Sequence, residues 1–455
     1  MPRASRLFNV QGLTHNSSFV TRHSSFVSRI SYLVFRISYF VYHKVASMNP
    51  EPHIEISKNN SKLLLIVVDG LGGLPVKNGT TELELANTPH LDKLAVESAL
   101  GLHIPVDIGI PPGSGPGHLA IFGYDPVKFE IGRGILEALG LGLTVRETDI
   151  AIRGNYATVE YINGKPKIKD RRAGRISTEE NWRITQKIKT HIHEIDGVKI
   201  YMESGLEHRS AIVFRFPEQL NEGAAEINDT DPQKEGMEPY IPRGKNSKAE
   251  FVAGYVRKFI EQVSAILKDE PRANFLLLRG VSQKPKIESI EKKYSLKACC
   301  IAVYPMYKGL ASLVGMNLID FEGSNIADEV IALKRVWNDY DYFFLHIKKA
   351  DSYGEDGNYE GKIKVIEEFD KYIPEIVALN PDVLVITGDH STPSLLKSHS
   401  WHPVPVLLKS PYILGKTSQR FTERECLKGE LGIFEAKKLM ALMLANSLRL
   451  KKYGA

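Results

Sequence analysis

The sequence predicts an α/β fold in which a core with a mostly parallel sheet carries an inserted α+β domain. Three runs of consecutive apolar residues have the length and composition of parallel strands that are buried on both faces. These runs occupy residues 63–68, 342–347 and 383–387. Between the first two runs, alternating segments at residues 157–162 and 210–215 indicate antiparallel strands. A chain of 455 residues also exceeds one ordinary core, so two domains are expected.

The domain boundaries follow from these changes in pattern. We expect residues 56–128 and 296–455 to form the core, residues 129–295 to form the insertion, and residues 1–55 to be an unstructured or misassigned extension. The first fifty residues hold six of the 59 Lys and Arg and no Asp or Glu. Their short Ser-, Arg- and aromatic-rich repeats also fit a targeting peptide or a membrane-surface segment. If the extension is an artefact, Met48 is the initiator, and a chain starting there should fold and remain active.

Local signals place further elements along the chain. Thr88 followed by Pro89 predicts a helix start with Thr88 as the N-cap. The Gly- and Pro-rich segment around Ser114 is expected to open a second helix, and Asn163-Gly164 predicts a tight turn between strands. The remaining expectations are a surface excursion over residues 221–248, an amphipathic helix over residues 249–267 and a C-terminal helix over residues 436–450.

Composition narrows the class of protein. Outside the first fifty residues, 53 Lys and Arg face 54 Asp and Glu, so no nucleic-acid partner is expected. No apolar run reaches the roughly 20 residues that cross a bilayer, so no membrane partner is expected either. Cys299, Cys300 and Cys426 lack the spacing of a disulfide framework or a zinc site, which favours a cytoplasmic location. The sequence leaves the oligomeric state open, including a homo-oligomer.

Acidic residues and a histidine follow the three apolar runs. Asp69 follows the first run, Asp351 and Glu355 follow the second, and Asp389 with His390 follows the third. The carboxyl ends of parallel strands meet at one edge of a sheet, so these side chains are expected to converge. Carboxylates and imidazoles suit divalent metals such as Mn²⁺ or Zn²⁺. Alone, Asp69 also fits a turn cap, and Asp351 with Glu355 also fits a solvated acidic loop.

Other residues add to this pattern. His399 and His402 lie close in sequence to Asp389-His390, although either also fits a core or turn histidine. Ser114 stands between glycines and prolines, where its hydroxyl can approach a metal or a phosphate. The turn over residues 170–175 holds three arginines, whose guanidinium groups bind carboxylates and phosphates. The whole pattern predicts a metal-dependent phosphoryl-transfer enzyme with a serine nucleophile.

Five motifs carry a resemblance to a known family. They are Val67-Val68-Asp69-Gly70, Gly113-Ser114 with the segment 118–126, Arg153-Gly154-Asn155, the segment 170–175, and the segment 387–393. Jointly these motifs are highly specific. From about residue 62 to the C-terminus, the chain resembles the archaeal-type 2,3-bisphosphoglycerate-independent phosphoglycerate mutases of the alkaline phosphatase superfamily.

The resemblance implies a phosphatase-like core that holds two divalent ions, Mn²⁺ or else Mg²⁺, Co²⁺ or Zn²⁺, and an inserted domain that closes over phosphoglycerate. Ser114 is the implied nucleophile, and Lys308 is implied near the transferring phosphate. The implied ligands are Asp69, Ser114, Asp389 and His390 for one ion, and Asp351, Glu355 and His399 for the other. Glu355 stands where many relatives have histidine, which changes the charge and softness of that site. The implied substrate contacts are His118, Arg153, Asn155, Arg171, Arg172, Arg175, Arg209 and Arg279.

Two other hypotheses remain beside the mutase. A phosphomonoesterase of the same superfamily lets water, instead of glycerate, attack the phosphoserine, and it has no need of an arginine-bearing insertion. A non-catalytic binding protein on a decayed scaffold is disfavoured, because Ser114, Asp69, Asp389, His390 and His399 are all present together.

Overall fold

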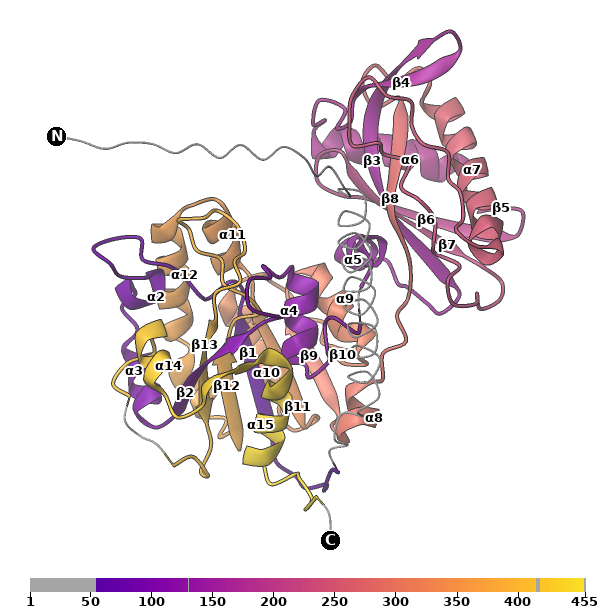
Figure 1. The fold of residues 1–455 in the computed structure, drawn as a ribbon. Coiled ribbons are helices and arrows are strands. Elements are labelled where there is room, and N and C mark those ends of the chain that lie inside the picture. Colours follow the sequence, from indigo (N-terminus) through magenta and orange to yellow (C-terminus); the bar gives the residue numbers. More distant parts are fainter. Residues whose placement is uncertain (1–54, 130, 415–417, 454–455) are drawn as a thin grey trace, which may run out of the picture. The chain divides into compact units, whose positions relative to one another are not determined.

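The computed structural model describes residues 55–129, 131–414 and 418–453 (Figure 1). The N-terminal extension therefore lies outside the described residues, apart from residue 55. In the described part of the chain, no helix combines the length and the apolar composition that a membrane span requires. Most of the described chain, Ile56–Leu450, forms a single compact unit.

An eight-stranded sheet has the strand order β10-β9-β11-β1-β12-β13-β2-β14. Only β13 among its described strands runs antiparallel to its neighbours, which are β12 and β2. The mostly parallel α/β fold expected from the sequence is confirmed. The strands are β1 (Leu63–Val68), β2 (Ala99–Ile104), β9 (Ala298–Ala302), β10 (Asn317–Leu318), β11 (Tyr342–Ile347), β12 (Val383–Thr387), β13 (Val404–Lys409) and β14 (Gly432–Glu435).

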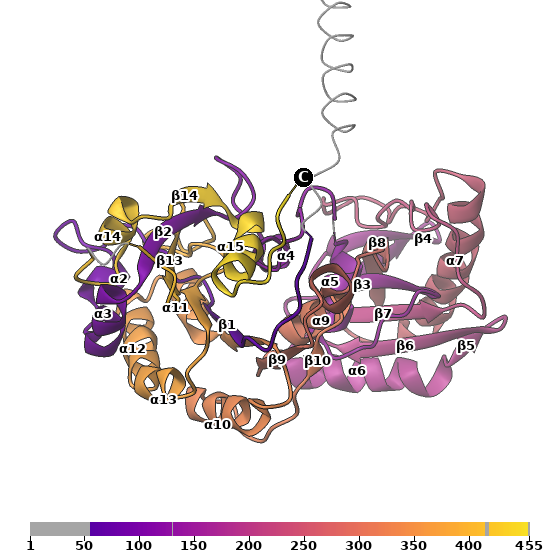
Figure 2. The same ribbon diagram turned by 90° about the horizontal axis from the view of Figure 1, so that it is seen from below.

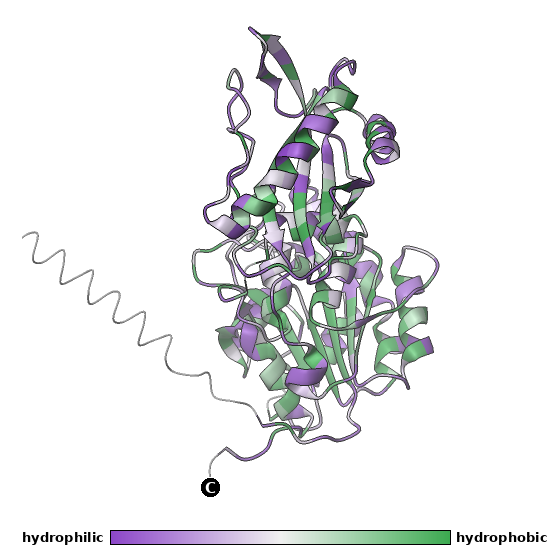
Figure 3. Ribbon diagram, turned by 90° about the vertical axis from the view of Figure 1, so that its right-hand side faces the viewer, coloured by the Kyte–Doolittle hydropathy of each residue, from purple (hydrophilic) through white to green (hydrophobic). Residues whose placement is uncertain are grey.

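Helices cover both faces of this sheet (Figure 2). Alternate residues of β1 belong to different cores: Leu65 packs in the cluster that includes α4, α9 and α15, and Ile66 packs in the cluster that includes α3, α10 and α12. All six residues of β1 are buried, as expected for a central parallel strand, and hydrophobic residues dominate these strands (Figure 3). The helices of this region are α2 (Glu82–Leu85), α3 (Pro89–Val96), α4 (Ser114–Ile121), α8 (Ile290–Tyr294), α9 (Pro305–Leu313), α10 (Ile326–Val336), α11 (Lys349–Glu355), α12 (Tyr359–Asp370), α13 (Ile373–Val377), α14 (Glu423–Lys428), the 3₁₀ helix η1 (Ala436–Lys438) and α15 (Leu439–Asn446).

Residues 149–283 form a second, antiparallel sheet of six strands. Its order is β4-β3-β7-β6-β5, and β8 also pairs with β3. The Asn163-Gly164 turn joins β3 to β4, and both residues have positive φ angles, as the expected hairpin turn requires. The elements are α5 (Arg133–Gly140), β3 (Asp149–Ile162), β4 (Lys165–Asp170), α6 (Thr178–His191), β5 (Glu194–Ile195), β6 (Val198–Ser204), β7 (Arg209–Arg215), α7 (Ser247–Leu267) and β8 (Phe275–Gln283).

One local expectation is confirmed and two need correction. Thr88 occupies the N-cap position of α3, as expected, although its side chain makes no capping hydrogen bond. The C-terminal helix ends at Asn446, earlier than expected, and starts with a 3₁₀ turn. The segment over residues 221–248 is not wholly a surface excursion, because Thr230 is buried and its hydroxyl accepts a hydrogen bond from Leu278 N in β8. Asp231 beside it is buried as well.

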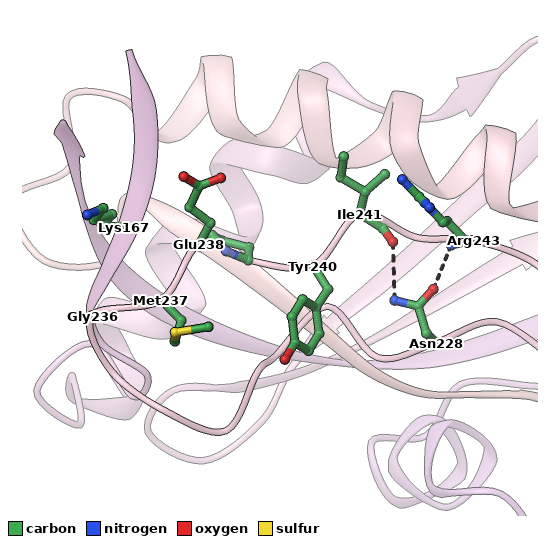
Figure 4. A pocket seen from close by; sticks show the side chains of 9 residues that line it. Lys167, Asn228, Gly236, Met237, Glu238, Tyr240, Ile241 and Arg243 are labelled. Carbon is green, nitrogen blue, oxygen red and sulfur yellow. Dashed lines mark hydrogen bonds between the residues drawn. The ribbon is translucent and has the colours of Figure 1, made fainter. Parts of the chain in front are cut away.

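Residues 232–241 of that segment form a narrow loop on the surface, whereas Ala224 and Ile227 pack in the hydrophobic core beside the six-stranded sheet. The side chain of Asn228 joins the two arms of the loop: its amide donates to Ile241 O at 3.2 Å, and its oxygen accepts from Arg243 N at 2.7 Å (Figure 4). The main chain of Met237 accepts a hydrogen bond from Ile168 N in β4. The loop therefore extends the edge of the six-stranded sheet, and Thr230 and Asp231 lie at its inner end.

Candidate active site

Three strands of the eight-stranded sheet bring acidic residues together at their carboxyl ends. Asp69 follows β1, Asp351 lies in α11 after β11, and Asp389 follows β12. All three carboxylates are buried. The strands β11, β1 and β12 are direct neighbours and parallel, so their ends coincide, as the sequence pattern predicts.

Two groups of ligand atoms meet within this cluster. Asp69, Asp389 and His390 form one group, and Asp351, His390 and His399 form the other; in each, the ligand atoms lie within 4.8 Å of one another. His390 belongs to both groups, and its ring stacks on that of His399 with centroids 3.7 Å apart.

Glu355 stands at the edge of the second group. Its Oε1 lies 3.5 Å from His399 Nε2, and Asp351 Oδ1 lies 3.4 Å from the same nitrogen. Asp351 and Glu355 therefore share one face of α11, as their spacing predicts. The Glu355 side chain is 55% exposed, so it is the solvent-facing member of the set.

The arrangement fits a divalent cation. Asp69 Oδ1 and Asp389 Oδ2 are buried, and neither accepts a hydrogen bond from a residue that the structure describes. Buried acceptors that lack donors are costly unless a cation satisfies them. Carboxylate oxygens with imidazole nitrogens form a donor set that suits divalent ions.

Thr392 sets the orientation of His390. Its hydroxyl donates to Asp351 Oδ1 at 2.7 Å and lies 3.0 Å from His390 Nδ1. The hydroxyl has only one proton, so Nδ1–H of His390 must be the donor to Thr392. The lone pair of Nε2 then points toward Asp69, Asp389 and the Ser114 hydroxyl.

Ser114 is the first residue of α4, with Gly113 as the N-cap. Its Oγ lies 3.4 Å from His390 Nε2. Gly117, one turn further, approaches the strand end so closely that an added Cβ would lie 2.5 Å from Asp389 O. Glycine at this position therefore lets α4 bring Ser114 to the cluster. Its place at the helix N-terminus gives Ser114 free backbone N–H groups that favour a phosphate.

Lys348 supplies positive charge to the cluster. Its Nζ lies 3.0 Å from Asp69 Oδ2 and 2.5 Å from Asp351 Oδ2. Burial opposes charge on Lys348, but the two carboxylates outweigh it and raise the lysine's pKa. Burial raises the pKa of Asp351, but His399 and Lys348 offset this and hold it at about 2. Burial lowers the pKa of His399, but hydrogen bonds to Asp351 and Glu355 raise it to about 11.

Two predicted site residues, His118 and Lys308, have other contacts in the structure. His118 is fully buried, and its Nδ1 is 2.8 Å from Ser114 O and 3.2 Å from Asp389 Oδ2. In the structure its nearest charged partner is therefore Asp389, and its contact with substrate stays a prediction. The ammonium of Lys308 lies over the ring of Phe321 at 5.8 Å, and its neighbour Tyr307 instead donates a hydrogen bond to Asp69.

The six-stranded sheet gathers arginines on one face. Arg153 on β3 is directly opposite Arg279 on β8, and Asn155 is opposite Arg209 on β7. Burial lowers the pKa of Arg153; Glu137 counteracts this, and nearby Arg209 and Arg279 lower it further. Mutual repulsion of this kind is characteristic of a site that receives an anion.

The other predicted arginines differ in their partners. Arg171 makes a two-point ion pair with the buried carboxylate of Asp231, at 2.8 Å from Nε and 2.7 Å from Nη2. Arg175 is exposed and lies 3.8 Å from Glu207. Arg172 is exposed; burial lowers the pKa of the nearby His208, and the charges of Arg209 and Arg172 lower it further.

Asp231 is expected to hold Arg171 in place, and its Oδ2 also lies 3.6 Å from Nη1 of Arg279. Asp231→Asn removes the charge from a buried pair, so we expect a loss of about 2–3 kcal/mol in the free energy of unfolding. Denaturant unfolding measures this loss. In the matched variant Glu160→Gln, which breaks the exposed pair with Lys169, the change should stay within about 0.5 kcal/mol. Equal losses in both variants would contradict a special role for Asp231.

Sequence reasoning missed several members of these clusters. Lys348 directly follows β11. The argument that residues after parallel strands meet at one edge of the sheet therefore also covers Lys348. Thr392 lies within the 387–393 motif but was assigned no role. Asp231 and His208 lie in loops, and no sequence pattern shows that they turn inward.

Comparison with known proteins agrees with the geometry. A profile of the metalloenzyme superfamily matches residues 61–446. A probable 2,3-bisphosphoglycerate-independent phosphoglycerate mutase from Aquifex aeolicus is 69% identical over 400 residues, which cover 88% of this chain and 98% of that protein. A protein of the same description from Thermus thermophilus is 52% identical and covers 88% of this chain and 97% of its own length.

Two solved structures resemble the fold of this chain. The cofactor-independent phosphoglycerate mutase from Thermoplasma acidophilum has a TM-score of 0.68 and 28% identity, covering 85% of this chain and 100% of that one. A protein from Pyrococcus horikoshii has a TM-score of 0.72 and 31% identity, covering 88% of this chain and 100% of its own.

Proposed function

The chain belongs to the 2,3-bisphosphoglycerate-independent phosphoglycerate mutases of the metalloenzyme superfamily, and from this membership we propose that it interconverts 3-phosphoglycerate and 2-phosphoglycerate. The observation that carries the proposal is the position of Ser114, at the N-terminus of α4 and 3.4 Å from His390. A nucleophile beside two groups of metal-ligating side chains suits transfer of a phosphoryl group.

Members of this superfamily bind divalent metal, and we place two ions in the cluster. Asp69, Ser114, Asp389 and His390 would hold one ion, and Asp351, His399 and Glu355 would hold the other. Mn²⁺ is our proposed ion, because most of these donors are carboxylate oxygens. When bound, the ions lower the pKa of the Ser114 hydroxyl and neutralise the charge of the phosphate oxygens.

Ser114 carries the reaction in two steps. Its Oγ attacks phosphorus of 3-phosphoglycerate, so the bond from Oγ to phosphorus forms as the bond from phosphorus to the substrate oxygen breaks. The proton that Oγ loses is balanced by the proton that the departing oxygen of glycerate gains. The neighbouring hydroxyl of glycerate then attacks the phosphoserine, which restores Ser114 and gives 2-phosphoglycerate.

Glycerate must stay bound between the two steps. We assign this task to the cationic face of the six-stranded sheet, where Arg153, Arg209 and Arg279 lie around Asn155. Guanidinium groups hold a carboxylate in a fixed orientation through paired hydrogen bonds. In this proposal residues 129–295 form the substrate domain, and residues 56–128 with 296–455 form the metal-binding core.

A coupled assay tests the proposal. Metal-stripped protein reloaded with Mn²⁺ should convert 3-phosphoglycerate to 2-phosphoglycerate without added 2,3-bisphosphoglycerate, followed through enolase. The same sample is assayed for inorganic phosphate. Release of phosphate without formation of 2-phosphoglycerate would contradict the mutase and favour a phosphomonoesterase.

A further inference from the structure

A cavity opens at the carboxyl ends of β9 and β11, with a volume of about 720 Å³. Binding sites for small organic molecules have volumes of about 300–1,000 Å³. Its wall is formed by Val303, Ile347, the start of α10, two residues of α11 and one face of α12. This cavity lies outside the groups of carboxylates and histidines described above, because none of those residues lines it.

The topology of the sheet explains why a cavity forms there. β9 and β11 are adjacent and parallel. The helix that follows β9 is α9, which packs in the core on one face of the sheet, whereas α12 after β11 packs in the core on the other face. Neighbouring strands whose connections leave on opposite faces create a crevice beyond their carboxyl ends, and ligands of α/β proteins bind in such crevices.

The wall combines positive charge with flat apolar surface. Lys349 and Lys364 both line the cavity and are exposed, and neither makes an ion pair or a hydrogen bond with a residue in the part of the chain that the structure describes. Tyr304, Tyr353 and Tyr372 supply aromatic faces.

The acidic groups of the wall do not cancel this charge. Glu368 already pairs with Lys371 at 2.6 Å. Glu329 is buried, and burial raises the pKa of its carboxyl to about 8, so it is mostly neutral near pH 7.

We propose that this cavity binds a small organic anion with a flat apolar body, at a site separate from the phosphoglycerate site. The two unpaired lysines receive the anionic group, and the tyrosines with Val303 and Val365 enclose the flat body.

Lys348 joins this cavity to the carboxylate cluster. It lines the cavity, and its ammonium lies 3.0 Å from Asp69 and 2.5 Å from Asp351. An anion in the cavity thus approaches the lysine that contacts both carboxylates. α11 borders both the carboxylate cluster and the cavity. It carries Asp351 and Glu355 toward His399, and it carries Tyr353 toward the cavity.

Calorimetric titration of the full chain loaded with Mn²⁺ tests the proposal independently of mutase activity. The probe is naphthalene-1-sulfonate, which has a flat body and one charge and is not a phosphate ester. We expect one site with a dissociation constant of about 1 mM or lower. 1-Naphthol lacks the charge and methanesulfonate lacks the flat body, so each should bind at least about tenfold more weakly.

Variants locate the site. Lys349→Gln with Lys364→Gln should weaken binding of the probe at least about fivefold. Lys93→Gln, which removes an exposed lysine of α3 that does not line the cavity, should leave binding unchanged. Saturating 3-phosphoglycerate should not displace the probe. Absence of binding, unchanged binding in the double variant, or displacement by 3-phosphoglycerate would each overturn the proposal.

Discussion

Replacing Ser114 by alanine should reduce turnover by about 10⁴-fold or more, as nucleophile deletions do in other enzymes. The change removes the attacking oxygen, which lies 3.4 Å from His390 Nε2, and one proposed metal ligand. Folding should survive, because the side chain is only partly buried at the start of α4. The coupled mutase assay measures the loss, and thermal unfolding checks the fold.

A matched control distinguishes the loss of the nucleophile from a general effect of removing a serine hydroxyl near the carboxylate cluster. Ser352→Ala changes an exposed serine on α11, beside Asp351, and should leave turnover near that of the unmodified protein. Mass spectrometry of a trapped reaction should find one phosphate on the peptide that contains Ser114. A phosphate on histidine, or near-normal turnover in Ser114→Ala, would refute the proposed mechanism.

Removal of divalent metal should abolish the mutase activity, and addition of Mn²⁺ should restore it. Asp69 Oδ1 and Asp389 Oδ2 are buried acceptor atoms that no described residue satisfies, and a cation bound to them would also attract the reacting phosphate. Elemental analysis should find two ions for each chain. Full activity in excess chelator, with no metal found, would contradict the two-ion proposal.

The pH dependence of metal binding follows from His399. Its pKa is raised to about 11 without metal, so the ring carries a proton that a cation must displace. Binding therefore releases a proton, and affinity rises as the pH rises toward that value. Between pH 6 and pH 8, the Mn²⁺ concentration for half-maximal activity should fall by up to about tenfold per pH unit. A pH-independent midpoint would contradict protonation of His399 in the metal-free protein.

The parallel core was predictable because its strands carry a local signal. A central strand such as β1 is buried on both faces, so its sequence is a continuous apolar run, and the residue after it lies at the edge of the sheet where ligands bind. This is why Asp69, Asp389 and His390 could be grouped from sequence alone, although about 320 positions separate them.

Contacts that depend on how a loop folds back were not predictable. Asp231 lies in a polar segment typical of a surface loop, yet its carboxylate is buried against Arg171. The burial of His118 likewise depends on Gly117, which lets α4 press against Asp389. Neither contact leaves a trace in the periodicity of the sequence, because both depend on the distance between two elements.

Lys348 gives the carboxylates a counter-charge that belongs to the chain itself. Buried carboxylates without positive partners strongly destabilise a fold, but here the ammonium contacts both Asp69 and Asp351, and the protonated ring of His399 lies beside Asp351. We therefore expect the chain to fold before any ion arrives, and an ion to leave without unfolding it. An emptied molecule would then regain activity when divalent ions return, without synthesis of new protein.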